Sequence, residues 1–61
     1  PDDLTAALDA EPDARATWDG FPPSPRKAML WWIISAVRPE TRARRIATVV
    51  EKATRGERAQ G

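Results

Sequence analysis

The chain has 61 residues, a formal net charge of +1, and neither Cys nor His. A chain of this length forms at most one domain, and its composition excludes a disulfide framework and the usual structural zinc sites. Its longest apolar-rich stretch, residues 28–37, is much shorter than the roughly 20 residues that cross a bilayer. The acidic first residues do not resemble a secretory signal, so we predict a cytoplasmic protein with no membrane contact.

Charge is divided unevenly along the chain. Residues 1–20 carry six acids and one Arg, for a net −5, whereas residues 21–61 carry nine Lys or Arg and three acids, for a net +6. The simple interpretation is that the two halves neutralise each other in the fold, because charge runs are usually solvated or self-paired.

Proline divides the first part of the chain into two predicted short helices. The first ends before Pro12, because the residue before a proline avoids the helical region. The second runs from Pro12, which suits a first turn, to about Asp19, with Gly20 as its stop. Phe21-Pro22-Pro23 then forms a stiff connection. The apolar positions of the two helices are Leu4, Ala7, Leu8, Ala14 and Trp18.

The third predicted helix has Ser24 as its N-cap, Pro25 at its first position, and an end near Val37, before Pro39. Apolar residues occupy almost its whole circumference. One stripe with helical spacing, expected to face the core, consists of Met29, Trp32, Ile33 and Ala36. A neighbouring outer face consists of Leu30, Trp31, Ile34 and Val37.

The fourth helix is predicted from Pro39 to Arg55, with Gly56 as its stop. Its apolar stripe is Ile46, Val50 and Ala53. We therefore predict an all-α fold, a compact bundle of four short antiparallel helices, with residues 1–56 as the domain and 57–61 as a loose tail. The expected core consists of Trp18, Phe21, Trp32, Ile33, Ile46 and Val50, with Leu4 and Leu8 closing one end.

The run WIISAVRPETRARRI at residues 32–46 resembles the signature of the bacteriocin-protection, YdeI/OmpD-associated family. PDDL at 1–4 and DARATWDGFPPS at 13–24 support the resemblance, which covers about residues 1–52. It implies a small helical bacterial domain, found alone or at the end of longer proteins, with a loose link to stress or bacteriocin tolerance. It implies no catalytic residue. Trp31 and Ile34 depart from the pattern, because the family has more polar residues there.

The outer face of the third helix is the first candidate site. Four short helices cannot surround one of their number, and contiguous exposed apolar surface usually marks an interaction site. We predict that this face binds a protein, as a homodimer seam or as a docking face for another domain. The alternative is that the first two helices and the Phe21-Pro22-Pro23 connection cover it.

A basic stripe on the fourth helix is the second candidate. Its members recur at helical spacing and are Arg38, Arg42, Arg45 and Lys52. A linear basic face can follow a phosphate backbone, so a weak nucleic-acid-binding protein is the alternative function, although no base-reading motif accompanies the stripe. The competing interpretation is that acids of the first half pack against it, namely Asp9, Glu11, Asp13 or Asp19.

Catalytic chemistry has little basis in this sequence. The chain has no His, Cys or Tyr, its Ser24 is explained by capping, and Ser35 falls within a predicted helix. Catalysis usually needs a nucleophile with a base, a metal cage, or carboxylates in contrasting environments. We therefore predict an interaction module that is not an enzyme and that needs no cofactor and no metal.

Overall fold

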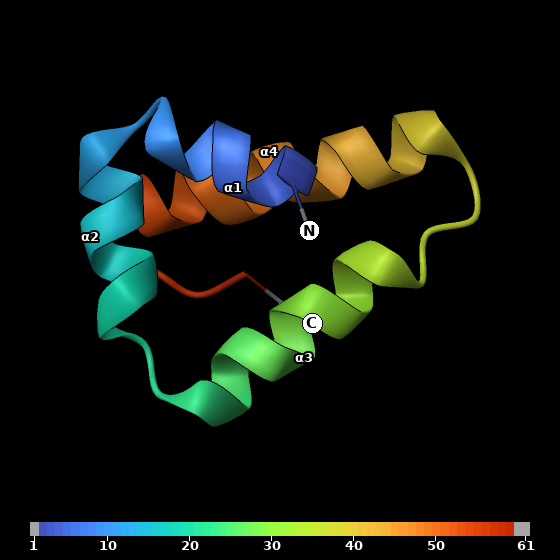
Figure 1. Ribbon diagram of the computed structural model, residues 1–61. Coiled ribbons are helices and arrows are strands. Elements are labelled where there is room, and N and C mark those ends of the chain that lie inside the picture. Colours follow the sequence, from blue (N-terminus) through green and yellow to red (C-terminus); the bar gives the residue numbers. More distant parts are fainter. Residues whose placement is uncertain (1, 60–61) are drawn as a thin grey trace.

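The computed structural model describes residues 2–59, which form four helices joined by short links (Figure 1). They are α1 (Asp2–Asp9), α2 (Pro12–Gly20), α3 (Pro23–Ile34) and α4 (Pro39–Thr54). No strand occurs within this described range. The prediction of an all-α fold of four short helices is confirmed.

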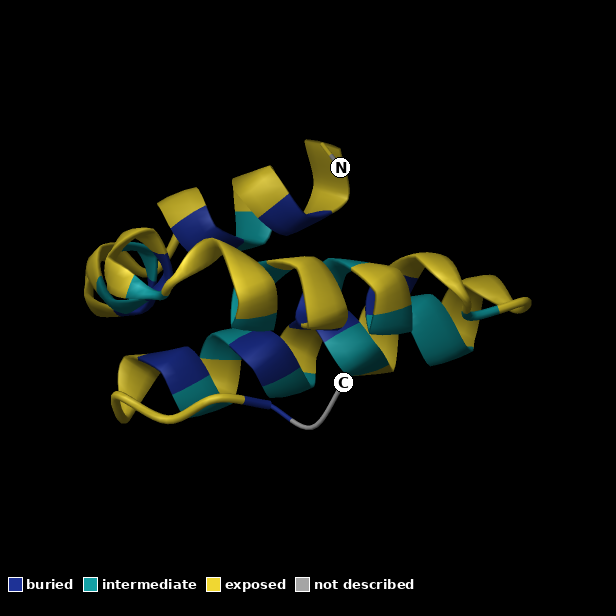
Figure 2. Ribbon diagram, turned by 90° about the horizontal axis from the view of Figure 1, so that it is seen from below, coloured by how far each residue is buried: buried dark blue, intermediate teal, exposed yellow. Residues whose placement is uncertain are grey.

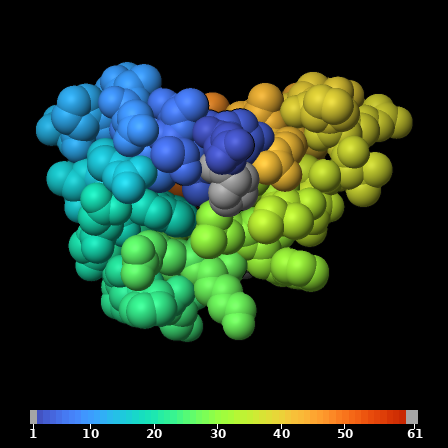
Figure 3. Space-filling view, in the orientation of Figure 1, coloured from blue at the N-terminus to red at the C-terminus, as the bar shows by residue number. Residues whose placement is uncertain are grey.

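Helix α4 is the longest, with 16 residues, and each of the other three helices packs against it. In the space-filling view, α1, α2 and α3 cover most of it on the face shown (Figure 3). Helix α2 crosses the end of the bundle and is seen nearly end-on in Figure 2. Helix α3 runs opposite to α1, and α4 runs opposite to α3. Helix α4 therefore runs in the same direction as α1 (Figure 1). The predicted antiparallel arrangement is therefore wrong for this pair.

The bounds of α3 differ from the prediction at both ends. Pro22 occupies the N-cap and no side chain caps the helix, so Ser24 lies inside the first turn. Pro23 starts the helix because a first-turn residue needs no N–H donor. Helix α3 ends at Ile34, where the Ser35 hydroxyl donates a hydrogen bond to the Trp32 carbonyl at 3.0 Å. Val37 consequently lies in the link to α4.

Most buried residues of the core lie on the inner faces of the helices (Figure 2). Trp32, Phe21 and Val50, which we expected inside, are half-buried and pack at its margin. Val49, not Val50, is the fully covered valine of α4. The buried residues are Leu4, Leu8, Ala14, Trp18, Met29, Ile33, Ile46, Val49, Ala53 and Ala59.

Gly56 ends α4 with a left-handed residue at φ 76°. The Glu57 N–H donates to the Lys52 carbonyl at 2.8 Å, and the Gly56 N–H donates to the Ala53 carbonyl at 2.9 Å. These two bonds form a Schellman motif, which turns the chain sharply after the helix. In the segment that follows, Ala59 is buried against the core. The loose tail predicted for residues 57–61 stays a prediction. Residues 60–61 lie outside the described range.

Candidate functional site

The outer surface of α3 and the link that follows it expose three large apolar side chains. Trp31 is 70% exposed, Ile34 51% and Val37 95%. We refer to these three residues as the α3 face. Leu30, the fourth residue predicted for this surface, is half-buried and packs against the core.

The α3 face is open because of how the neighbouring helices are placed. Met29 and Ile33 are fully buried on the side of α3 that faces inward, and Trp31 and Ile34 are turned away from them by helical geometry. Helix α1 packs on α4 and α2. Phe21 meets Trp18 edge-to-face, with ring centroids 6.3 Å apart. The covering by the first two helices and the proline connection, which we held as the alternative, therefore does not extend to these three side chains.

A cation stands at each end of the α3 face. Lys27 lies one turn before Trp31 on the same side of the helix, and Arg38 directly follows Val37. Both are exposed, and neither has an ion pair or side-chain hydrogen bond within residues 2–59. The surface is thus an apolar strip between two unpaired positive charges.

Two of the four basic-stripe residues are engaged within the chain. Arg42 holds Asp3 of α1 through two hydrogen bonds, Nε to Oδ2 at 2.6 Å and Nη2 to Oδ1 at 3.0 Å. This bidentate contact lowers the pKa of Asp3 to about 2 and raises the pKa of Arg42. Asp3 was not among the four acids that we expected against the stripe. Asp9 and Asp19 instead contact Arg15, at 3.5 and 3.2 Å.

Arg45 joins α4 to the end of α3. Its Nη1 donates to the Trp32 carbonyl at 2.6 Å and to the Ser35 hydroxyl at 3.2 Å. The guanidinium also lies over the Trp32 ring, 5.1 Å from the centroid. A cation is favourable at this position, because the last carbonyls of a helix carry partial negative charge.

The prediction of phosphate contacts along the stripe stays a prediction. Arg38 is exposed and Lys52 half-buried, and no interaction within residues 2–59 engages either side chain. Arg42 and Arg45 hold α4 to α1 and α3, so any phosphate would compete with those contacts. Both residues belong to the run that carries the family resemblance, and here they have a structural role.

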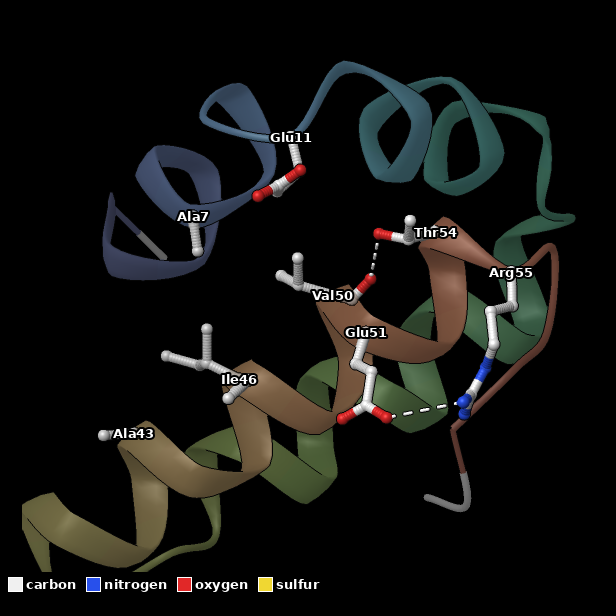
Figure 4. A pocket seen from close by; sticks show the side chains of 9 residues that line it. Ala7, Glu11, Ala43, Ile46, Val50, Glu51, Thr54 and Arg55 are labelled. Carbon is white, nitrogen blue, oxygen red and sulfur yellow. Dashed lines mark hydrogen bonds and ion pairs between the residues drawn. The ribbon is translucent and has the colours of Figure 1, made fainter.

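Sequence reasoning missed a groove between α1 and α4, with a volume of about 590 Å³ (Figure 4). Its lining is mostly apolar, with polar side chains at the rim. The signal that could have revealed it is a row of alanines, Ala7, Ala43 and Ala47, where larger side chains would fill the space. The lining residues are Ala7, Glu11, Ala43, Ile46, Ala47, Val50, Glu51, Thr54 and Arg55.

Two other kinds of site, a metal site and a membrane span, have no candidate in the described part of the chain. Across residues 2–59, no cluster of acidic, His or Cys side chains is arranged to hold a metal ion. Within the same range, every helix is too short or too polar to cross a membrane.

The fold and surface together define a small all-α domain that presents an apolar helical strip between two cations. The family model described as bacteriocin-protection, YdeI or OmpD-associated matches residues 1–56, and the chain belongs to that family. The resemblance noted from the run at residues 32–46 is therefore confirmed. No curated protein and no solved structure matches the chain.

Proposed function

We propose that this domain acts by protein association, with the α3 face as its contact surface. The observation that carries the proposal is the exposure of three large apolar side chains, Trp31 and Ile34 one turn apart on α3 and Val37 three residues further along the chain. Monomeric proteins rarely leave a contiguous apolar patch open unless a partner covers it. The domain is thus an interaction module of the YdeI/OmpD-associated type, not an enzyme, and we place its action in the bacterial cytoplasm on the basis of the family.

Trp31 is the expected centre of the contact. Tryptophan is enriched among the few residues that carry most of an interface's binding energy. The residue is 70% exposed, so association would remove much apolar surface from water, and each Å² removed contributes roughly 25 cal/mol. The engaged guanidiniums of Arg42 and Arg45 give the nucleic-acid alternative no comparable support.

The test is molar mass measured by light scattering over a wide range of protein concentrations. We expect the mass of the chain to rise above that of a monomer, and we expect Trp31→Ala to suppress the rise while leaving the far-ultraviolet circular dichroism unchanged. Arg44→Ala is the matched control, because Arg44 is exposed and its side chain has no partner within residues 2–59. A monomer mass at every concentration would contradict self-association through this face.

A further inference from the structure

We propose that the α3 face docks into the α1–α4 groove of a second copy of this chain. The inference rests on the proposed function, because it names the surface that receives the α3 face. Position, shape and charge all favour a second copy as the occupant of the groove.

The groove and the α3 face lie on different sides of the molecule. In Figure 4 the groove opens toward the viewer between α1 and α4, and α3 passes behind α4. One chain can therefore offer its α3 face to one neighbour and its groove to another.

The groove has the size and lining to receive large apolar side chains. Its volume of about 590 Å³ falls within the roughly 300–1,000 Å³ of typical binding pockets. The small side chains of Ala43 and Ala47 leave space in the groove, and Ile46 and Val50 make its lining apolar. Trp31 and Ile34, one turn apart on α3, are the side chains that would fill it.

Charge also matches the two surfaces. Glu11 and Glu51 stand on opposite rims of the groove (Figure 4). Glu11 has no ion pair within residues 2–59, and Glu51 is exposed and meets only Arg55, at 3.4 Å. Lys27 and Arg38 at the two ends of the α3 face supply the opposite sign. Complementary charge at a rim favours encounter and fixes orientation.

Two α3 faces are a poor match for each other. In an antiparallel pair, Lys27 of one copy would lie near Arg38 of the other. In a parallel pair, each of these cations would lie near the same residue of the second copy. Like charges brought together across an interface disfavour that pairing. Docking into the groove brings cations to carboxylates instead.

A contact between two different surfaces is heterologous, so it leaves one free surface of each kind at the ends of a dimer. Such contacts build closed rings or open chains of copies. The molar mass of the parent chain should therefore continue to rise beyond that of a dimer as concentration increases, unless a ring closes.

The decisive experiment mixes two variants that each lack one surface. Ala43→Gln/Ala47→Gln fills the groove, and Trp31→Ala/Ile34→Ala removes the inserted side chains; all four positions are exposed, so the fold should tolerate the changes. We expect each variant alone to associate on the order of thirtyfold more weakly than the parent. Mixed together, they should form a 1:1 complex with the mass of two chains, because each supplies the surface that the other lacks.

Ala16→Gln is the control, since it adds the same side chain at an exposed position of α2 away from the groove. Two results would overturn the inference: a groove-filled variant that associates as strongly as the parent, or variants that form no complex when mixed. In the first case Trp31→Ala/Ile34→Ala would still abolish association, so the proposed function would stand. If that variant associates like the parent, the proposed function fails as well.

Discussion

Trp31 and Trp32 are neighbours in the sequence with opposite surroundings. Helical spacing predicted that Trp32 shares a face with Met29 and Ile33 while Trp31 lies beyond it, and the structure places them so. The sequence did not predict how Trp32 is covered, since Arg45 reaches it across 13 residues of chain. Such a contact depends on the angle between two helices, which periodicity within one helix does not specify.

The Asp3–Arg42 pair makes a prediction about acid stability. The pKa of Asp3 is lowered from 3.8 to about 2 by the Arg42 guanidinium. A carboxyl with a depressed pKa in the folded state stabilises the fold above its ordinary pKa, and this contribution is lost as pH falls toward the folded value. The free energy of unfolding should therefore fall between pH 3.8 and about 2 through this residue.

Urea unfolding at a series of pH values measures that fall. We expect Asp3→Asn to be less stable than the parent at neutral pH and to show a smaller decline over the acid range. Asp2→Asn, at the adjacent exposed position, should keep the full decline. Parallel stability curves for Asp3→Asn and the parent chain would contradict the role assigned to this pair.

At the scale of the helices, the link between α3 and α4 depends on Arg45. Its removal leaves the Trp32 carbonyl without the 2.6 Å hydrogen bond and the Trp32 ring without the cation above it. Arg45→Met should lower the free energy of unfolding by about 1–3 kcal/mol, because a charged hydrogen bond and a cation–π contact are lost together. Chemical denaturation provides the value, and Arg44→Met, whose side chain points to solvent, should change it by less than about 0.5 kcal/mol.

The end of α4 depends on Gly56, and here sequence reasoning was sufficient. Glycine after the last periodic residue predicted the stop, and the left-handed φ of 76° confirms it. Gly56→Ala should lower the unfolding free energy by about 1–2 kcal/mol, because a Cβ disfavours this backbone conformation. No other atom lies within 4 Å of the added carbon, so the cost comes from the backbone alone.

Gly20→Ala is the matched control for that change. Gly20 closes α2 without a positive φ, and its added Cβ also meets nothing within 4 Å. Alanine at a helical position should be neutral or raise stability by up to about 1 kcal/mol. The midpoint temperatures of thermal unfolding of the two variants should move in different directions. An equal fall of both midpoints would argue against the left-handed cap as the cause.

Helix ends without a glycine were harder to place from the sequence. Ser24 is a favoured N-cap residue, yet α3 already starts at Pro23, because Pro23 suits the first helical position as well as Pro25 does. The outer face of α3 could be predicted because it lies on one helix. The α1–α4 groove could not, because it arises from the packing of two segments whose distance no local pattern gives.

For the whole molecule, the sequence indicated four helices but not their directions relative to one another. The transverse α2 makes α1 and α4 run in the same direction (Figure 1). The uneven charge was expected to neutralise itself, and in part it does, through Asp3 with Arg42 and through the acids around Arg15. Lys27, Arg38 and Glu11 stay outside that network within residues 2–59, and they frame the two surfaces proposed to meet.

The most direct measurement of the central claim is acrylamide quenching of tryptophan fluorescence at low and at high protein concentration. Trp18 is buried and Trp32 half-buried, so Trp31 should dominate the quenching of the dilute chain. If the α3 face binds another protein molecule, concentration should protect Trp31, and Trp31→Phe should remove most of the change. Identical quenching of the parent chain at both concentrations would contradict the claim.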